Sequence, residues 1–446
     1  MNRTLFRDGF NYFLSKIIPG GAGLLSVIVF VRMVGYAEYG RFAVLFATAM
    51  AFALGLSGWL GQGTLRFQSK YHTPADSASF QHATRFGALL SAVLGGLALA
   101  ISLWLSDGYS LWSLVLSVGF FAVALAYNIV YAQLQASLRS QSVLVFESIR
   151  SVGSFSFSLL LVVALSKTDH RLLLLGVLLG HLLPLLLHAI FERRRAKLTF
   201  DSPRLALPRR EGALLGEVWH YGWPVGLWLF CQQGLVVSDR FFIQKFAGYS
   251  AAGIYASMYD LIVRSFSLVF APITLAVHPL IMRHWNLGET SRAIQAIRSG
   301  LRWQLSMFLP IAALLLAASP WLVHMALGQA NQEAASIVLP LALGGFFWSA
   351  ALLAHKPLEI LCRTNRMLVG IFIALVINVA GNWLFVPRYG YRAAAYVTIA
   401  SASAYLLMLA VLTPRRELHT SASAGLTAVQ ERAQSNSSEP VMTSPS

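Results

Sequence analysis

The stretch GYAEYGRFA at residues 35–43 returns at residues 248–256 as GYSAAGIYA, 213 positions further along the chain. The same offset, applied without a gap, also aligns charged positions, namely Lys70 with Arg283, Asp76 with Glu289 and Arg85 with Arg298. Two copies of one unit therefore make up most of the chain. The glycines in both stretches predict a short turn at which the chain reverses between two helices.

The composition places these two units in a membrane. Of 446 residues, 57% are hydrophobic and only 12% are charged, whereas a soluble domain carries about 25% charged residues. Apolar stretches of the length that spans a bilayer lie near residues 10–31, 42–61, 86–106, 111–131, 146–166, 172–191, 218–238, 251–280, 303–327, 334–355, 367–387 and 393–413. The sequence thus predicts an all-α polytopic membrane protein with twelve transmembrane helices and excludes an ordinary soluble enzyme.

The repeat divides these helices into two pseudo-symmetric six-helix lobes. We expect an N-terminal lobe at 1–191, a basic cytoplasmic linker at 192–215, a C-terminal lobe at 216–413 and a disordered cytoplasmic tail at 414–446, which is rich in small and polar residues. Six spans per unit give both lobes the same orientation, so an axis along the membrane normal relates them around a central cavity. This arrangement is typical of alternating-access transporters, although duplication alone would also leave a repeat.

The surplus of basic residues reports membrane orientation. The formal net charge is +16 and the isoelectric point is near 10.2, values that suggest nucleic-acid binding in a soluble protein. Here 25 of the 34 Lys and Arg residues fall on the side of the amino terminus and 8 on the other side. The positive-inside rule then places both termini in the cytoplasm. Membrane lipids, and no nucleic acid, are the expected partners of these charges.

Three segments resemble the Wzx-type polysaccharide flippases, whose superfamily also holds multidrug and toxin extruders and lipid II flippases. They are VRMVGYAEYGRFAVL at 31–45, SDRFFIQKFAGYSAAGIYASMYDL at 238–261 and INVAGNWLFVPRYGYRAAAYVT at 377–398. Arg392 departs from the family pattern, which more often has a small residue there. The resemblance implies that an undecaprenyl-diphosphate-linked oligosaccharide moves from the inner to the outer leaflet of a bacterial inner membrane, for O-antigen, exopolysaccharide or capsule. It also implies a polysaccharide polymerase and a chain-length regulator as partners.

A substrate of this kind needs cations inside the membrane, and Arg264 is the first candidate. An intramembrane arginine costs about 2.5 to 3.5 kcal/mol at a helix centre, so we expect Arg264 to face the cavity and contact the diphosphate. Asp260, four residues earlier, lies on the same helix face, where it orients Arg264, exchanges a proton or merely neutralises it. Lys16 in the first span either faces the cavity or extends to the cytoplasmic surface.

Charged residues near the span ends are candidates for gating and for substrate capture. Asp239 and Arg240 follow the span at 218–238, and we expect them at the outer rim, where they pair with Arg32 or Lys245 to latch the outer mouth; a fixed turn is the alternative. On the cytoplasmic side, three cations are candidates to attract the diphosphate as the substrate enters, although ordinary positive-inside residues would look the same: Arg66, Lys70 and Arg283.

Other functions are less consistent with the sequence. A multidrug exporter of the same superfamily favours an acidic cavity, whereas the single central acid found, Asp260, lies beside an arginine. A polysaccharide polymerase or ligase depends on a large periplasmic loop, and the predicted outer loops are short. The sequence shows no phosphate-binding glycine loop, no nucleophile elbow and no metal-ligand spacing, so we expect a transporter that is not an enzyme, without cofactor or metal, driven by H⁺, Na⁺ or downstream consumption of the product.

Overall fold

We describe the protein from a computed structural model that covers residues 3–71, 73–106, 109–196, 208–328, 332–361 and 363–414. The centre of the predicted linker and nearly all of the predicted tail lie outside these residues. The first half contains α1 (Arg3–Val34), α2 (Tyr36–Phe67), the short 3₁₀ helix η1 (Gln68–Lys70), α3 (Pro74–Leu105), α4 (Leu111–Ala136), α5 (Ser140–Leu165) and α6 (His170–Ala196). The second contains α7 (Arg209–Asn286), α8 (Thr290–Ala317), α9 (Ser319–Leu327), α10 (Gln332–Ser336), α11 (Val338–Ala354), α12 (Lys356–Ile360) and α13 (Thr364–Leu412).

Helix α7 is a hairpin of two arms. Its 78 residues would extend about 117 Å as one straight helix. Gly248 interrupts it with φ 83° and ψ 172°, nearly the angles of the repeat-related Gly35, φ 80° and ψ 167°. Arg240 and Asp260, on either side of this turn, form an ion pair at 2.8 Å, whereas 20 residues of straight helix separate two residues by about 30 Å. The chain therefore reverses at Gly248, between a first arm at 209–247 and a second arm at 249–286.

Helix α13 reverses in the same way. Gly390 has φ 59° and ψ −149°, and the Arg366 side chain donates to the carbonyl of Leu412, 46 positions later, at 3.2 Å. Ten helices of the described residues are long and apolar enough to cross a membrane. Counting α7 and α13 as two arms each gives twelve membrane-length segments, the number that the sequence predicts. The all-helical membrane fold is confirmed.

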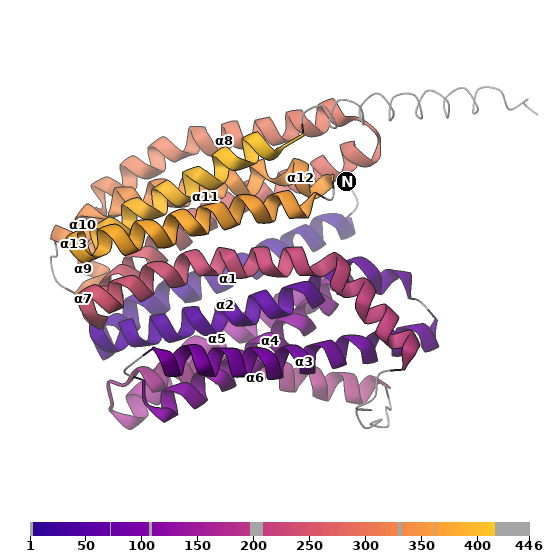
Figure 1. Ribbon diagram of the computed structural model, residues 1–446, viewed down its shortest axis with the longest axis horizontal. Helices are drawn as coiled ribbons and strands as arrows, with labels where there is room; N and C mark the ends of the chain where they lie inside the picture. Colours follow the sequence, from indigo (N-terminus) through magenta and orange to yellow (C-terminus); the bar gives the residue numbers. More distant parts are fainter. Residues whose placement is uncertain are drawn as a thin grey trace, which may run out of the picture.

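The two halves of the chain contact each other through equivalent residues. A Cβ added at Gly40 would collide with the backbone of Tyr249, and a Cβ added at Gly253 would collide with the backbone of Tyr36. Gly40 and Gly253, like the two tyrosines, occupy matching positions in the repeat. Reciprocal contacts of this kind are what a two-fold relation between two units produces. We call this end of the bundle, at the left in Figure 1 and carrying the turn glycines, the outer end.

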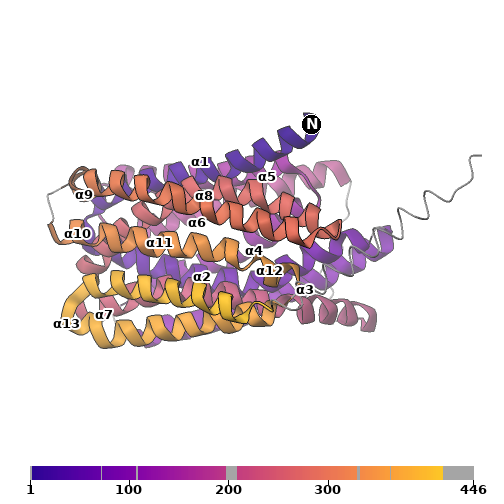
Figure 2. The same ribbon diagram turned by 90° about the horizontal axis from the view of Figure 1, so that it is seen from above.

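Glycines also bring α2 against the first arm of α7 over most of its length. A Cβ would collide with the opposite helix at three successive levels, namely Gly55 with Phe230, Gly58 with Leu229 and Gly63 with Val218. Small residues allow two helix backbones to approach closely. In Figure 1, α3–α6 form the lower half and α8–α13 the upper half, with α1, α2 and α7 between them. Figure 2, seen from above, shows the helices running side by side.

Candidate functional site

Arg264 lies between the two halves of the molecule. It is 16 residues beyond the turn at Gly248, about 24 Å along the second arm of α7. Its side chain is 38% exposed, and a Cβ added at Gly23 of α1 would collide with its guanidinium group. The absence of a side chain at position 23 thus makes room for Arg264, which is directed towards α1.

The charge of Asp260 is balanced mainly by another arginine. Its carboxylate accepts a hydrogen bond from Arg240 at 2.8 Å, whereas the predicted pair with Arg264 is longer, at 3.9 Å. Arg240 is held in place because it also donates to the carbonyl of Ala43 at 3.1 Å. Asp260 therefore orients Arg264 only weakly, and the guanidinium of Arg264 makes no hydrogen bond to the described residues.

The predicted position of Asp239 and Arg240 at the outer rim is wrong. Both residues are buried, at 2% and 3% relative exposure, and neither pairs with Arg32 or Lys245 among the described residues. The physical reason is the length of the first arm, which continues to residue 247, so that both side chains lie about two turns inside the helix. Both contact the second arm of α7; Asp239 also contacts α13, and Arg240 also contacts α2.

Asp239 is the centre of a buried polar cluster, which we call the Asp239 cluster. Its Oδ1 accepts hydrogen bonds from the amides of Asn378 at 3.0 Å and Asn382 at 2.7 Å. Its Oδ2 accepts from the hydroxyls of Tyr255 at 2.7 Å and Thr398 at 2.9 Å. A buried carboxylate is costly unless hydrogen-bonded, and all four of these partners are neutral. Both arms of α7 and both arms of α13 supply the cluster, so its hydrogen bonds hold the two hairpins together.

Lys16 lies on the first helix, with its ammonium group at the hydroxyl of Tyr131 of α4, 3.0 Å away. The residue is exposed, and it shares one face of α1 with Gly23, seven residues on. The nearby ion pair of Glu147 and Arg150 in α5, at 2.8 Å, was not predicted; their spacing of three residues is the signal that would have found it. The first lobe thus also holds an accessible cation beside an internal ion pair.

Arg32 links the two halves at the outer end, but not through a carboxylate. Its guanidinium donates to the carbonyl of His324 in α9 at 2.9 Å. One turn further on, the hydroxyl of Tyr36 donates to the carbonyl of Leu327. The partner of Arg32 in the described residues is thus a backbone carbonyl, and the role of Arg32 in gating stays a prediction.

The three expected capture residues lie in different settings at the inner end. Lys70 forms an ion pair with Glu217 of α7 at 2.7 Å. The hydroxyl of Tyr71 donates to the same carboxylate, and partial burial together with this hydrogen bond raises the pKa of Tyr71. Arg66 lies over the ring of Tyr221 at 4.7 Å. Arg283 is exposed. Arg66 of α2 and Lys70 of η1 therefore both contact α7.

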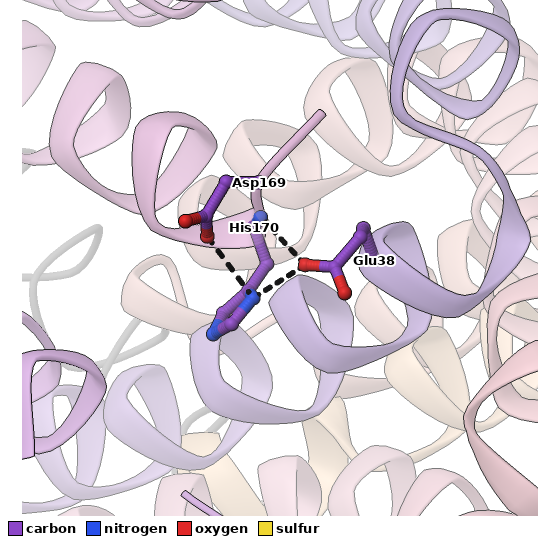
Figure 3. A group of neighbouring side chains, drawn as sticks. All are labelled: Glu38, Asp169 and His170. Atoms are coloured by element: carbon purple, nitrogen blue, oxygen red, sulfur yellow. Dashed lines mark hydrogen bonds and ion pairs between the residues drawn. The ribbon is translucent and has the colours of Figure 1, made fainter. Parts of the chain in front are cut away.

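A further charged group joins α2 to α6 at the outer end (Figure 3). The ring of His170 contacts Glu38 at 2.6 Å and Asp169 at 3.3 Å, and the potential ligand atoms of these three residues lie within 4.8 Å of one another. Arg41 and Arg171 pair with the two carboxylates. Partial burial alone would raise the pKa of Asp169, but hydrogen bonds from Arg171 outweigh it and hold this pKa below its ordinary value. In this group the two carboxylates are balanced by two arginines, and the contacts between Glu38 and His170 join α2 to α6.

The comparisons with known proteins identify the family. The polysaccharide biosynthesis protein family matches residues 5–285, more than half of the chain. The chain belongs to this family. No curated protein matches the sequence.

Solved structures show which fold this polysaccharide biosynthesis protein has. It is similar to the outward-facing conformation of a multidrug resistance MATE family transporter of the MOP superfamily, at 13% identity over 93% of this chain and 95% of that chain, with a TM-score of 0.64. A MOP superfamily transporter from Pyrococcus furiosus gives a TM-score of 0.59 at 13% identity, over 93% and 96% of the two chains. A eukaryotic MATE transporter gives 0.62 at 13% identity, over 95% and 99%. The fold is therefore the MATE fold.

In this member of the polysaccharide biosynthesis family, each half contributes one accessible cation to the helices that meet between the lobes. Lys16 is 18 residues, about 27 Å, from the outer end of α1, and Arg264 is about 24 Å from the outer end of its arm. The guanidinium of Arg264 reaches α1 at Gly23, which is seven residues, about 10 Å, closer to the outer end than Lys16. Beside each cation lies an acid that already pairs with another arginine, Glu147 with Arg150 and Asp260 with Arg240. Neither cation is therefore neutralised by its neighbouring acid, and each is available to an anion. The central cavity expected around them stays a prediction.

Proposed function

We propose that this protein is a flippase that moves an undecaprenyl-diphosphate-linked oligosaccharide from the inner to the outer leaflet of a bacterial inner membrane. Its family and its MATE fold support this function. The observation that carries the proposal is Arg264, a half-exposed cation deep in the membrane whose neighbouring acid is already engaged by Arg240. We place both termini in the cytoplasm. The flipped oligosaccharide is then used by a polymerase and a chain-length regulator in O-antigen, exopolysaccharide or capsule synthesis.

Arg264 binds the diphosphate of the substrate. Its guanidinium matches two phosphate oxygens with parallel N–H donors, and no hydrogen bond to the described residues has to be broken first. Gly23 provides the space into which the guanidinium projects. Lys16, about two turns further towards the inner end of α1, adds a second positive charge from the other lobe. Arg66 and Arg283 attract the diphosphate from the cytoplasmic side before it reaches Arg264 and Lys16.

Alternating access uses the reciprocal glycine contact as the outer gate. The backbones of the two repeats meet there through Gly40 and Gly253, and the bond from Arg32 to His324 adds a second link across the same end. These contacts support a state that is closed on the outer side. Opening requires the two lobes to separate there while the substrate is held at Arg264.

The Asp239 cluster is the coupling site in this proposal. A proton or Na⁺ that binds Asp239 replaces some of the four hydrogen bonds that now hold the carboxylate. Because these bonds tie the arms of α7 to α13, their exchange changes the packing of the helix that carries Arg264. Movement of substrate and movement of the ion are thereby linked through one helix hairpin.

A multidrug exporter is the second candidate, because the structural neighbours include multidrug transporters. An exporter of cationic compounds needs a carboxylate that is free to meet them. Asp260 is only 15% exposed and is paired with Arg240, and Asp239 is buried under four hydrogen bonds. The arrangement of charge thus favours an anionic substrate.

The test uses Arg264→Ala together with two glycine variants of α1. Arg264→Ala abolishes flipping, and Gly23→Ala reduces it because the added methyl group displaces the guanidinium without removing its charge. Gly21→Ala is the matched control, since a Cβ there meets nothing within 4 Å. Lipid-linked oligosaccharide is assayed in each leaflet of cells that express normal amounts of each protein. Normal surface polysaccharide in Arg264→Ala, or accumulation of substrate in the outer leaflet, would show that the proposal is wrong.

A further inference from the structure

A groove of about 1030 Å³ lies at the outer end of the C-terminal half. It is formed between the turn at Gly248, helix α10 and the turn at Gly390, which the structure brings together from three distant parts of the chain. Among its lining residues are two arginines, Arg388 and Arg392, on either side of the Gly390 turn. None of these residues takes part in the site around Arg264.

The two arginines of the groove have no role in membrane orientation. Once the buried Arg240 is left out, only 7 of the 34 Lys and Arg residues fall on the outer side, where the positive-inside rule disfavours them, and two of these 7 line one groove. Arg388 is exposed and makes no ion pair within the described part of the chain. Arg392 approaches Glu333 only to 3.7 Å, with both side chains at least half exposed. Tyr391 donates to the same carboxylate at 3.2 Å, so Glu333 is already engaged.

Aromatic side chains place the groove at the level of the lipid headgroups. Tyr389 and Tyr396 line it and are 64% and 62% exposed, Phe385 lines it at 50%, and Trp383 lies nearby at 54%. Exposed tyrosine and tryptophan rings gather at the membrane–water boundary, where one edge meets apolar chains and the other meets water. Basic pockets at this depth bind lipid headgroups. The groove is therefore open to lipid along its aromatic side and positive on its polar side.

We propose that this groove binds the phosphate group of a lipid in the outer leaflet. Arg388 and Arg392 donate to the phosphate oxygens, while Tyr389 and Tyr396 cover the first carbons of the lipid below the headgroup. The proposal uses the orientation assigned under the proposed function. The phosphate has two possible sources, a membrane phospholipid or the undecaprenyl carrier after flipping, and the chemistry of recognition is the same for both.

Lipid binding to the purified full-length protein tests this site without any transport step. Native mass spectrometry follows titration with phosphatidylglycerol, phosphatidylethanolamine or undecaprenyl phosphate. Every protein carries Arg264→Ala, so that binding at the proposed transport site does not contribute. The groove variants are Arg388→Gln/Arg392→Gln and Arg388→Gln, and the single variant is compared with Lys167→Gln, which removes the same charge from the outer side away from the groove. Each charge-assisted hydrogen bond lost weakens binding about tenfold.

A loss of affinity for all three lipids in the groove variants, with the control unchanged, supports a phosphate site filled by phospholipid. A loss confined to undecaprenyl phosphate supports the site with the carrier as its occupant. Equal affinities in the groove variants and the control overturn the proposal. Arg388→Gln alone is the second variant, because Arg388 is exposed and makes no ion pair with the described residues, so its replacement leaves the fold intact. Failure of the flippase proposal leaves these affinities unchanged, so the two proposals are tested separately.

Discussion

Replacing Gly253 by alanine should shift the protein out of the outward-closed state. The new Cβ would lie inside the van der Waals radius of the Tyr36 carbonyl, and the nearest other atom is the backbone of Gly40. Backbone atoms have no rotamer by which to avoid it, so the outer ends of α2 and α7 must separate. In the outward-open state of the proposed cycle these ends are already apart, and the methyl group causes no collision.

The size of this shift follows from the cost of overpacking. Adding a methyl group to a tightly packed contact costs about 1–3 kcal/mol. Because the cost falls on only one of two states, it changes their ratio by about 5- to 150-fold. A protein that is almost entirely outward-closed should then show a measurable outward-open fraction.

Spin labels at Lys167 and Ser250, both exposed at the outer end on opposite halves, report this change as a distance distribution. The labels are placed in a background without Cys231 and Cys362. We expect one short distance for the unmodified protein and an added longer one for Gly253→Ala. Gly216→Ala, a helical glycine of α7 whose Cβ would meet nothing within 4 Å, is the matched control. Identical distributions for Gly253→Ala and this control would refute the reasoning.

Three further outcomes are expected from single substitutions. Asp239→Ala removes the acceptor of four buried donors, and each donor that water does not reach lowers the free energy of unfolding by about 1–3 kcal/mol. The Tm of Asp239→Ala should therefore fall well below that of Asp239→Asn, and equal Tm values would show that the hydrogen bonds of the Asp239 cluster do not stabilise the fold. Gly248→Ala places a side chain at a positive φ and should cost about 1–3 kcal/mol, seen as a lower Tm than that of Gly216→Ala. The pKa of Asp169 is lower in the folded protein than its ordinary value, so the ionised carboxylate stabilises the fold above the ordinary pKa of about 3.9, and this stability is lost as the pH falls through the folded-state value. The Tm difference between the unmodified protein and Asp169→Asn should therefore shrink below about pH 4. A difference that stays constant with pH would argue against a stabilising role of this carboxylate.

Features set by periodicity could be predicted from the sequence. The spans follow from apolar runs, and the relation between the halves follows from the repeat at Gly35 and Gly248, whose backbone angles agree within a few degrees. The position of Arg264 between the lobes could also be predicted, because an isolated cation in a membrane helix has few other places to go. In each case the deciding residues lie within one segment or one repeat offset.

Pairings across a helix hairpin could not be predicted in this way. The sequence favours Asp260 with Arg264, four residues apart, but the closer partner is Arg240, 20 residues away on the opposite arm. The first arm is also about two turns longer than its apolar run, because Asp239 and Arg240 are polar yet buried. A hydropathy argument ends a helix at such residues, since it cannot know that Asn378 and Asn382 will hydrogen-bond the carboxylate.

The partners of the internal acids also explain why positive charge is available for the substrate that we propose. If Asp260 balanced Arg264, as the spacing along the helix suggests, the site between the lobes would be neutral and Arg240 would be a buried cation without a counter-ion, which is strongly unfavourable. The hairpin turn at Gly248 brings Arg240 to Asp260 instead and satisfies both buried charges. The cation that remains is the one that reaches α1 at Gly23. The fold thus leaves its unbalanced charge at the position where an anion between the two lobes would meet it.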